Sequence, residues 1–356
     1  MSSGLIQEPL IISLLALMLA ALLTPIVRRL AVVTGTVDRP AARKIHLAPI
    51  PLLGGLAIYA GFTLALIGAG DQSFLTQLAG MLIGATLVSA VGALDDRWGL
   101  NPWIKLGSQL LAGVTLILSG VQVQSAPWPW LNWAITLVWV AGITNALNLL
   151  DNMNGLSAGL AAVAAAFFFV LAALSGQYLV APFAAALLGA SLGFLRYNFR
   201  DASIFMGDSG SLFIGFVLAA LAIKLRFANS PDITWLIPVL VLGVPIFDTT
   251  LVTLSRLRRG LNPLTSPGQD HVSHRLVATG MTQREAVLTL YLASGALGLV
   301  ALYLLRASRL EGIVVLLLLT LAFVLGLMHM ERILVPGAKA EDNHNDTKHT
   351  KHAQRI

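Results

Sequence analysis

Residues 145–155, N-A-L-N-L-L-D-N-M-N-G, form a dense group of polar side chains between two apolar runs of the sequence. Asparagine amides and the carboxylate of Asp151 are costly at the end of a membrane helix unless they bind something. The alternative is a polar turn that caps two helices, because Asn and Asp also favour caps and turns. The stretch on its own leaves both interpretations open.

Further carboxylates follow or precede other apolar runs. Asp95 and Asp96 close one run as L-D-D-R-W, and adjacent carboxylates repel each other unless a cation or a phosphate-bound metal compensates. Asp208 lies between two glycines in F-M-G-D-S-G-S, where backbone N–H groups could approach a phosphate and the carboxylate could hold Mg²⁺. The alternatives are a helix end followed by a turn for the pair, and an ordinary N-cap for Asp208. Asp248, in V-P-I-F-D-T-T, could belong to a site or only pair with Arg256 or a neighbouring polar group.

Two basic segments could meet an anion. Residues 43–46, R-K-I-H, enter an apolar run and could ion-pair with a phosphate or only enforce topology. The segment 255–283 contains G-Q-D-H-V-S-H-R-L, in which His271 and His274 could share a helix face. These histidines lack further nearby zinc ligands, so contact with an anionic substrate is favoured over a metal site.

The elements that must position these side chains are apolar runs, which recur along the whole chain. Of the 356 residues 56% are hydrophobic and 11% charged, whereas a soluble domain is roughly 25% charged. We expect an all-α, polytopic integral membrane protein, because the strands of a membrane β-barrel would alternate apolar and polar residues. Without cysteine, neither a disulfide framework nor a thiolate metal site is possible. About eleven transmembrane helices are predicted, at residues 5–27, 51–69, 74–94, 103–119, 131–150, 156–174, 178–195, 210–226, 234–254, 284–304 and 311–330.

The distribution of Lys and Arg predicts the orientation. Alternate connections together with the C-terminal tail and Arg284 hold 19 of the 23 basic residues. Because cytoplasmic segments carry the excess of Lys and Arg, the N-terminus is expected outside and the C-terminus in the cytoplasm. The acidic motifs fall on the same side. Residues 1–330 are predicted to form a single transmembrane catalytic domain, and 331–356 a polar, disordered cytoplasmic tail.

One face of the membrane is thus expected to gather carboxylates, amides, glycines and basic side chains. Binding a polyanion through a divalent metal requires this set, because the metal and the basic groups would neutralise a diphosphate. An amide-rich loop could recognise a neutral head group through hydrogen bonds.

The motifs resemble those of the polyprenyl-phosphate N-acetylhexosamine-1-phosphate transferase family, a glycosyltransferase family 4 of which undecaprenyl-phosphate GlcNAc-1-phosphate transferases are members. The resemblance runs from about residue 43 to 276. It rests on six motifs in the family's order: R-K-I-H-L-A-P-I-P-L-L-G-G, L-D-D-R, N-A-L-N-L-L-D-N-M-N-G, F-M-G-D-S-G-S, V-P-I-F-D-T and D-H-V-S-H-R-L.

The resemblance implies a reaction in which a lipid phosphate attacks the β-phosphorus of a UDP-N-acetylhexosamine. The products are a polyprenyl-diphospho-sugar and UMP, and the product lipid would start a cell-envelope glycan. GlcNAc is the expected sugar, undecaprenyl or decaprenyl phosphate the acceptor, and Mg²⁺ the cofactor, with Mn²⁺ as a substitute. The expected location is the inner (plasma) membrane, among membrane lipids, with the active site facing the cytoplasm. No nucleic acid partner is expected, and a homodimer is left open.

The resemblance also implies roles for the acidic motifs. Asp208 matches the Mg²⁺ ligand, and Asn148 lies in the motif that helps to hold the metal or the diphosphate. Asp95 and Asp96 match an acidic pair, the first of which is often proposed to deprotonate the lipid phosphate. That base is dispensable on physical grounds, because a phosphate monoester with a second pKa of ~6 is already mostly dianionic near pH 7. Asp151 matches the first acid of the D-G-x-D-G motif.

Other residues match substrate-binding positions with departures. Lys44 matches a basic residue that meets phosphate, and His271, His274 and Arg275 match the loop for sugar and diphosphate recognition. Asn154 stands where a second Asp is usual, at a position that meets uracil, and an amide still offers a donor and an acceptor. The loop reads H-V-S-H rather than carrying adjacent histidines, which leaves the identity of the sugar open.

Three alternatives remain at this stage. A phospho-MurNAc-pentapeptide translocase is disfavoured because its histidine-rich loop pattern is absent. A secondary transporter should show charged residues near the bilayer midplane and, in many folds, internal repeats, and neither is evident. A structural membrane scaffold would not need the polar cluster.

Overall fold

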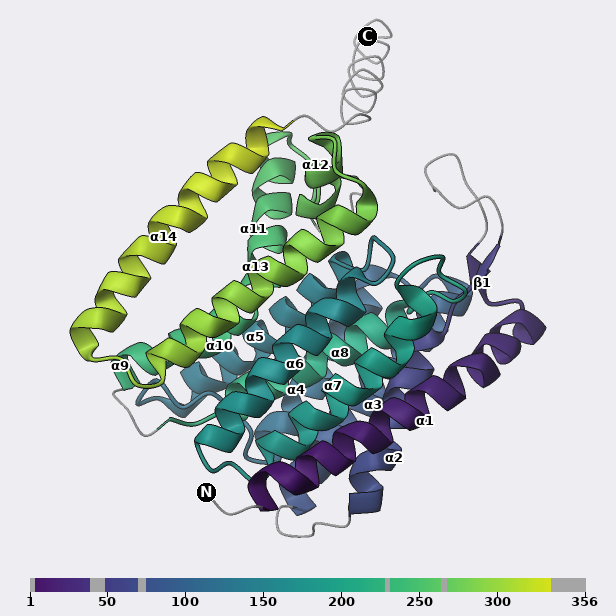
Figure 1. Ribbon diagram of the computed structural model, residues 1–356, viewed down its shortest axis with the longest axis horizontal. Coiled ribbons are helices and arrows are strands. Elements are labelled where there is room, and N and C mark those ends of the chain that lie inside the picture. The colour runs from purple at the N-terminus through teal and green to yellow at the C-terminus, as the bar shows by residue number, and fades with distance from the viewer. Residues whose placement is uncertain (1–3, 39–48, 70–74, 228–230, 264–267, 334–356) are drawn as a thin grey trace, which may run out of the picture.

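The computed structural model describes residues 4–38, 49–69, 75–227, 231–263 and 268–333, which are almost entirely helical (Figure 1). The helices are α1 (Gly4–Thr34), α2 (Gly54–Ala69), α3 (Leu75–Trp98), α4 (Pro102–Leu118), α5 (Pro129–Leu149), α6 (Leu156–Leu174), α7 (Val180–Asn198), α8 (Asp208–Lys224), α9 (Pro231–Thr234), α10 (Leu236–Val241), α11 (Gly243–Arg258), α12 (Val272–Ala278), α13 (Gln283–Leu304) and α14 (Arg309–Arg332). Two short strands, β1 (Val37–Asp38) and β2 (Ile50–Pro51), pair antiparallel.

Seven of the described helices are long and apolar enough to cross a membrane: α1, α3, α5, α6, α7, α13 and α14. Two shorter apolar helices lie within α2 and α4. The prediction of an all-α, polytopic membrane protein is therefore confirmed. The number of eleven spans and their orientation stay predictions.

The helix α8 lies in the middle of the bundle, where it packs against α2, α3, α5, α6 and α7 (Figure 1). Every residue from Ser209 to Ile223 is buried, because the helix is apolar on all sides and a helix of that kind is stable only when it is surrounded. Two glycines allow neighbouring backbones to approach its first turn. A Cβ at Gly92 of α3 would lie 2.3 Å from the carbonyl oxygen of Asp208, and one at Gly55 of α2 would lie 2.0 Å from the amide nitrogen of Gly210.

The prediction of one continuous helix at 234–254 is wrong. The structure divides this stretch into α10 and α11, with the break at Leu242. The cause is Pro245, which has no N–H to donate to the carbonyl four residues earlier, next to Gly243, which is a weak helix former. The helix is therefore interrupted at Leu242 instead of running as one continuous rod.

The last helix, α14, is the least packed part of the bundle. It diverges from α13 in Figure 1 and touches the rest mainly through α11 and α9. The contact with α11 includes an edge-to-face pair of Phe247 and Phe323, whose ring centroids are 5.2 Å apart. Gly312 is its only buried residue, so its remaining apolar surface is typical of a helix that faces lipid.

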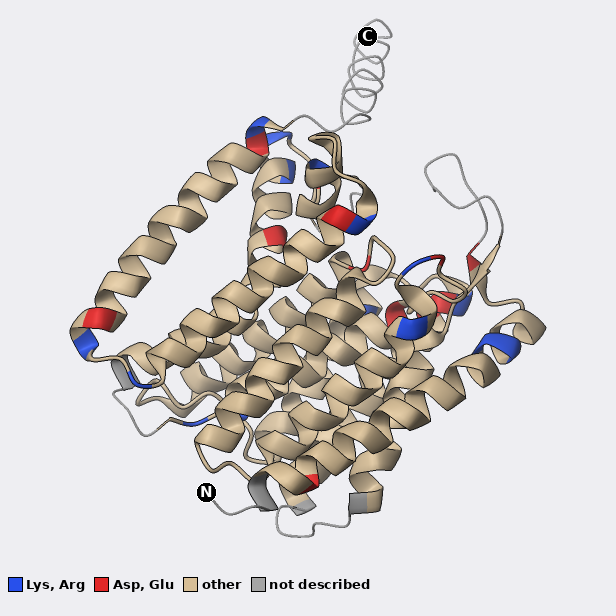
Figure 2. Ribbon diagram, in the orientation of Figure 1, with Lys and Arg blue, Asp and Glu red and all other residues tan. Residues whose placement is uncertain are grey.

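Charged side chains are concentrated at one end of the bundle (Figure 2). This end holds the C-terminal ends of α3, α11 and α14, the start of α8, and the segment around α12. The opposite end carries a smaller group, which includes Lys224, Arg226, Arg309 and Glu311. The middle of the long helices is almost free of charge, as the sequence predicted.

Candidate active site

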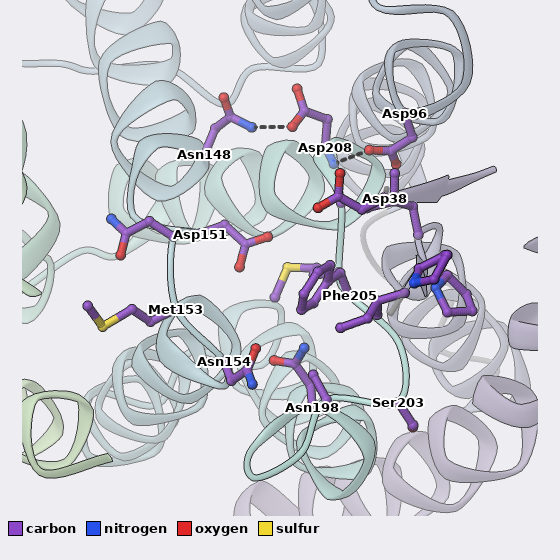
Figure 3. Close-up of a pocket in the computed structure, with 18 of the residues that line it drawn as sticks. Asp38, Asp96, Asn148, Asp151, Met153, Asn154, Asn198, Ser203, Phe205 and Asp208 are labelled. Carbon is purple, nitrogen blue, oxygen red and sulfur yellow. Dashed lines mark hydrogen bonds between the residues drawn. The ribbon is translucent and has the colours of Figure 1, made fainter. Parts of the chain in front are cut away.

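A cavity of about 980 Å³ opens at the charged end of the bundle. It lies at the C-terminal ends of α3, α5 and α7 and at the start of α8, and its rim includes the β hairpin and α12 (Figure 3). The residues that line it are Arg28, Asp38, Pro49, Ile50, Pro51, Leu52, Asp95, Asp96, Asn148, Asp151, Asn152, Met153, Asn154, Asn198, Asp201, Ala202, Ser203, Phe205, Met206, Gly207, Asp208, Gln269, His274 and Gln283.

Asp96 caps the central helix from a different part of the chain. One of its carboxylate oxygens accepts the backbone N–H of Asp208 at 2.7 Å, and the other accepts that of Ser209 at 3.1 Å (Figure 3). These are N–H groups that a helix start leaves without intrahelical partners. Gly207 makes the approach possible, because its φ is 71° and a Cβ there would lie 2.5 Å from Asp96. Asp96 thus fixes the position of Asp208 relative to α3.

Lys105, in the first turn of α4, joins the two acidic motifs. Its ammonium donates to Asp95 at 2.9 Å and to Asp208 at 2.8 Å. The other oxygen of Asp95 accepts the backbone N–H of Leu100, in the turn between α3 and α4. A cation therefore lies between carboxylates that are separated by more than a hundred residues in the sequence.

Asn148 approaches Asp208 from the C-terminal end of α5. Its amide nitrogen donates to Asp208 at 3.0 Å (Figure 3). The same nitrogen donates to the hydroxyl of Ser211 at 2.9 Å. Its amide oxygen has no hydrogen-bond partner among the described residues. One turn earlier, Asn145 exchanges two hydrogen bonds with Gln109 of α4, at 3.1 and 2.7 Å, and this pair holds α5 against α4.

Asp151 differs from the other acids because its carboxylate has no hydrogen-bond or ion-pair partner in the described part of the chain. It lines the cavity on the turn between α5 and α6 (Figure 3). Burial, together with the charges of Asp208 and Asp96, raises its pKa to about 8. Four carboxylates thus surround one side of the cavity, and Lys105 is the single cation bonded to them among the residues described. A further cation would stabilise this arrangement.

The turn that carries Asn154 is held from two sides. The N–H of Gly155 donates to Asn198 at 2.8 Å, and its carbonyl accepts the hydroxyl of Tyr291 from α13. Gly155 has a φ of 76°, and a Cβ there would lie 2.8 Å from the ring of Phe199, so only glycine fits. The amide nitrogen of Asn154 donates to the carbonyl of Arg200 at 3.0 Å. Its amide oxygen is left without a partner among the described residues.

The loop between α7 and α8 forms the opposite wall of the cavity. The N–H of Phe205 donates to the carbonyl of Pro51 at 2.8 Å, and its carbonyl accepts the N–H of Gly54 at 3.0 Å. The amide nitrogen of Asn198 donates to the carbonyl of Ile204 at 3.0 Å. The loop is therefore tied to β2, to the start of α2 and to the end of α7. These contacts place an aromatic ring in the cavity (Figure 3).

The helix α12 brings only one of its predicted site residues to the cavity. His274 lines the cavity, whereas His271 is buried and bonds through Nδ1 to Asp248 at 2.7 Å. Asp248 also accepts the backbone N–H of Val272 at 2.7 Å. Burial, and then the charge of His271, lowers the pKa of His274 to about 4. His274 is therefore neutral near pH 7.

The other charged side chains around α12 bond to protein groups away from the cavity. Asp270 receives two hydrogen bonds from Arg256, at 3.0 and 2.9 Å, and one from Arg259 at 2.6 Å. Asp248 therefore pairs with a neighbouring polar group, His271, as one form of the alternative predicted, and not with Arg256. Arg275 is buried and does not line the cavity; its donors reach the carbonyls of Asp270, Met330 and Ile333 and the hydroxyl of Ser255.

Seven of the residues predicted from the sequence line the same cavity, whatever their roles: Asp95, Asp96, Asn148, Asp151, Asn154, Asp208 and His274. Lys44 lies outside the described residues. Sequence reasoning missed Lys105, Ser211 and Phe205. A signal for Lys105 existed, because a lysine inside a predicted span is expensive unless it is paired. Phe205 and Ser211 are the first and last residues of the motif F-M-G-D-S-G-S, in which only Asp208 was given a role.

Comparison with known proteins adds an independent observation. Residues 78–226 match the sequence profile of a family described as Glycosyl transferase family 4. The chain is 34% identical over 304 residues to a probable undecaprenyl-phosphate N-acetylglucosaminyl 1-phosphate transferase of Bacillus subtilis, covering 83% of this chain and 84% of that protein. It is 33% identical to a decaprenyl-phosphate N-acetylglucosaminephosphotransferase of Mycolicibacterium smegmatis, over 82% of this chain and 80% of that one. An undecaprenyl-phosphate α-N-acetylglucosaminyl 1-phosphate transferase of Yersinia pestis is 30% identical, over 84% and 85% respectively.

Proposed function

The chain belongs to glycosyl transferase family 4, and we propose that it transfers N-acetylglucosamine 1-phosphate from UDP-N-acetylglucosamine to a polyprenyl phosphate and releases UMP. The transfer of this sugar phosphate to a polyprenyl phosphate follows from the names of the relatives, whose alignments cover about four fifths of this chain. The UDP donor rests on the resemblance and on the amide-rich wall of the cavity. The alternatives of a pentapeptide translocase and of a secondary transporter lose support accordingly.

The observation that carries the proposal is the convergence of four carboxylates around one cavity: Asp95, Asp96, Asp151 and Asp208. Within the described ranges, Lys105 is the one cation bonded to them. An excess of carboxylates is unfavourable by itself, because like charges raise one another's energy in a partly buried site. It is the arrangement expected of a protein that binds an anionic substrate together with a divalent cation.

The ligand set fits Mg²⁺. The available donors are oxygens, namely the carboxylates of Asp208 and Asp151 and the amide oxygen of Asn148, and Mg²⁺ prefers oxygen ligands. Among the described residues no three His, Asp or Glu side chains form a complete metal site. Mg²⁺ is often bound through one or two carboxylates together with the substrate phosphates. Mg²⁺ would supply charge neutralisation at the diphosphate, with Asp208 and Asn148 holding it.

The groups around Asp95 are arranged to position a phosphate nucleophile. Lys105 would neutralise phosphate charge while it holds Asp95 and Asp208 at a fixed separation. Because a phosphate monoester is mostly dianionic near pH 7, with a second pKa of ~6, Asp95 need not remove a proton from it. We therefore assign to Asp95 the positioning of Lys105 and the acceptor. Asp96 keeps the start of α8, and with it Asp208, in register.

The opposite wall suits the uridine. The amide oxygen of Asn154, which has no partner among the described residues, can accept from the N–H of uracil in the cavity that Phe205 also lines. His274 lines the part of the cavity next to α12 and would meet the sugar. His271 and Arg275 would act from behind the cavity wall, and Lys44 stays a candidate for a phosphate contact.

We infer further that the chain crosses the inner membrane eleven times, with the C-terminus and the cavity in the cytoplasm. The excess of Lys and Arg at the end that holds the cavity supports this orientation (Figure 2). A cytoplasmic cavity is where a nucleotide sugar would be available.

The test is release of UMP by the purified full-length protein in detergent or lipid. The assay contains Mg²⁺, undecaprenyl or decaprenyl phosphate, and one UDP-sugar at a time from UDP-GlcNAc, UDP-GalNAc, UDP-glucose and UDP-MurNAc-pentapeptide. We expect UMP with UDP-GlcNAc, dependent on both Mg²⁺ and the polyprenyl phosphate. Absence of UMP with every sugar would refute the proposal, and UMP with UDP-MurNAc-pentapeptide alone would replace the sugar assignment.

A further inference from the structure

The side chains of Asn152, Ser273 and His274 form a chain of hydrogen bonds between the α5–α6 turn and α12. Asn152 lines the cavity, and its amide nitrogen donates to the carbonyl of Leu149 at 3.2 Å. The hydroxyl of Ser273 donates to the amide oxygen of Asn152 at 2.7 Å. The same hydroxyl oxygen lies 3.3 Å from Nδ1 of His274. None of these contacts involves the carboxylates or Lys105.

The donors and acceptors in this series of hydrogen bonds can be assigned by starting from the carbonyl of Leu149. The carbonyl of Leu149 only accepts, so the amide group that faces it must be the NH₂ of Asn152, and the amide oxygen must face Ser273. A serine hydroxyl has one proton, and Ser273 gives it to that oxygen. Toward His274 the hydroxyl can therefore act only as an acceptor, and Nδ1 of His274 must carry a proton.

The consequence for His274 depends on its charge. Burial and the neighbouring His271 lower its pKa to about 4, so at neutral pH the ring carries a single proton. If that proton is on Nδ1, Nε2 has a free lone pair. Ser273 is fully buried, whereas His274 lines the cavity, so Nε2 is the ring nitrogen left for a ligand. A neutral ring with a lone pair attracts hydrogen-bond donors and gives no charge stabilisation to a diphosphate.

We propose that Asn152 and Ser273 are positioning residues that hold His274 in the Nδ1–H form, so that Nε2 accepts a hydrogen bond from the sugar of the nucleotide substrate. The group on the sugar is a donor, either a hydroxyl or the acetamide N–H. The role in sugar recognition rests on the proposed function, whereas the proton assignment stands on the structure alone. The serine of H-V-S-H thus takes part in the site at the position where the sequence departs from adjacent histidines.

The first experiment measures the tautomer without substrate. The full-length protein is labelled with ¹⁵N-histidine, and the ring nitrogens of His274 are identified by comparison with His274→Gln, since the chain contains seven histidines. At pH 7.5 we expect a protonated Nδ1 and an unprotonated Nε2. In Asn152→Ala, Ser273 is free to donate to Nδ1, so the proton should move to Nε2. Thr279→Ala, an exposed position in the C-cap of α12, is the matched control and should leave the tautomer unchanged.

The second experiment tests the contact with the sugar by steady-state kinetics of UMP release. For UDP-GlcNAc we expect His274→Gln and Asn152→Ala to raise KM about 3- to 10-fold with kcat within about twofold, the effect of losing one neutral hydrogen bond from binding. Ser273→Ala should give a smaller rise, and Ser273→Thr, which keeps the hydroxyl, should restore the value. The analogues are UDP-GlcNAc lacking the 3-, 4- or 6-hydroxyl, and UDP-2-deoxyglucose, which lacks the acetamide and has no hydroxyl in its place. The penalty of His274→Gln should vanish for the analogue that lacks the donor.

The outcomes separate the two parts of the proposal. A protonated Nε2 or a doubly protonated ring in the parent protein overturns the tautomer assignment, whatever the kinetics show. An Nδ1–H tautomer with an equal penalty for every analogue overturns the sugar contact while the assignment stands. If no UDP-sugar yields UMP, the proposed function fails, and with it the sugar contact, while the spectra still decide the tautomer.

Discussion

Lys105→Met removes the cation that joins Asp95 to Asp208 while it keeps a side chain of similar length. The ammonium makes two charge-assisted hydrogen bonds, of 2.9 and 2.8 Å. Without it, the two carboxylates repel each other, and Asp208 keeps only the amide of Asn148 as a side-chain donor. Both the spacing of the acids and the positive charge available to the substrate phosphates are lost.

The magnitude follows from the contacts and their burial. A hydrogen bond to a charged group contributes about 1.5–3 kcal/mol, and we take the lower value because the side chains of Lys105, Asp95 and Asp208 are 22%, 13% and 25% exposed. Two such bonds give about 3 kcal/mol, which corresponds to roughly a 100-fold loss of kcat/KM. The expected effect on Mg²⁺ affinity is in the opposite direction, an increase. With one positive charge fewer beside Asp208, half-saturation by Mg²⁺ should occur at a lower concentration.

The assay is UMP release at varied Mg²⁺, with Lys224→Met as the control. Lys224 ends the same helix, α8, at the opposite end of the bundle, so the chemical change is the same and the site is not touched. We expect the control to keep its activity and its Mg²⁺ requirement. If Lys105→Met retained more than a tenth of the activity, or needed more Mg²⁺ than the parent, the reasoning from its two ion pairs would be refuted.

The remaining predictions concern the cluster, the uridine wall, the helix contact and the pH dependence. Asp208→Asn should abolish UMP release without loss of membrane insertion, whereas Asp201→Asn, on the same cavity but outside the cluster, should keep most of it. Asn154→Ala should raise KM for UDP-GlcNAc by about 3- to 10-fold, as for one lost hydrogen bond, and an unchanged KM would end the assignment to uracil. Gly92→Ala should lower activity strongly, because its Cβ would lie 2.3 Å from the carbonyl of the first residue of α8; a fully active variant would show that α3 can shift without disturbing the site. His274 has a folded pKa of about 4, below its ordinary 6.5, so the unfolded chain binds the proton more readily; its contribution to stability is complete above pH 6.5 and is lost as the pH falls toward 4. The Tm should therefore decline over this window, and less steeply in His274→Gln.

Much of the fold could be predicted because hydrophobic run length is a strong signal for a membrane helix. The break at Leu242 was missed, although Pro245 and Gly243 stand in the sequence, because Pro is also tolerated in membrane helices when neighbours satisfy the freed backbone groups. The lateral order of the helices has no comparable signal. Nothing local marks α8 as central except that it is apolar on every side, and most of its neighbours share that property.

The acids of the site could be predicted because a carboxylate at the end of an apolar run needs a reason. Their partners could not, because each partner comes from a distant segment. Asp96 bonds backbone amides more than a hundred residues away, which no side-chain pattern can encode. Asp248 shows the same limit: proximity in sequence favoured Arg256, but the fold supplies His271. Contacts to the backbone and across helices need the packed structure.

The enclosed position of α8 has a consequence for how such enzymes diversify. Its first turn meets glycine backbones from α2 and α3, and its side chains are surrounded, so substitutions there would displace Asp208 before they could alter a substrate preference. The segments at the rim of the cavity, such as the loop after α7, are tied to their neighbours mainly through backbone hydrogen bonds, which a change of side chain leaves in place. Evolution of new donor or acceptor specificities should therefore proceed by exchange in these rim segments, while the acidic centre is inherited unchanged.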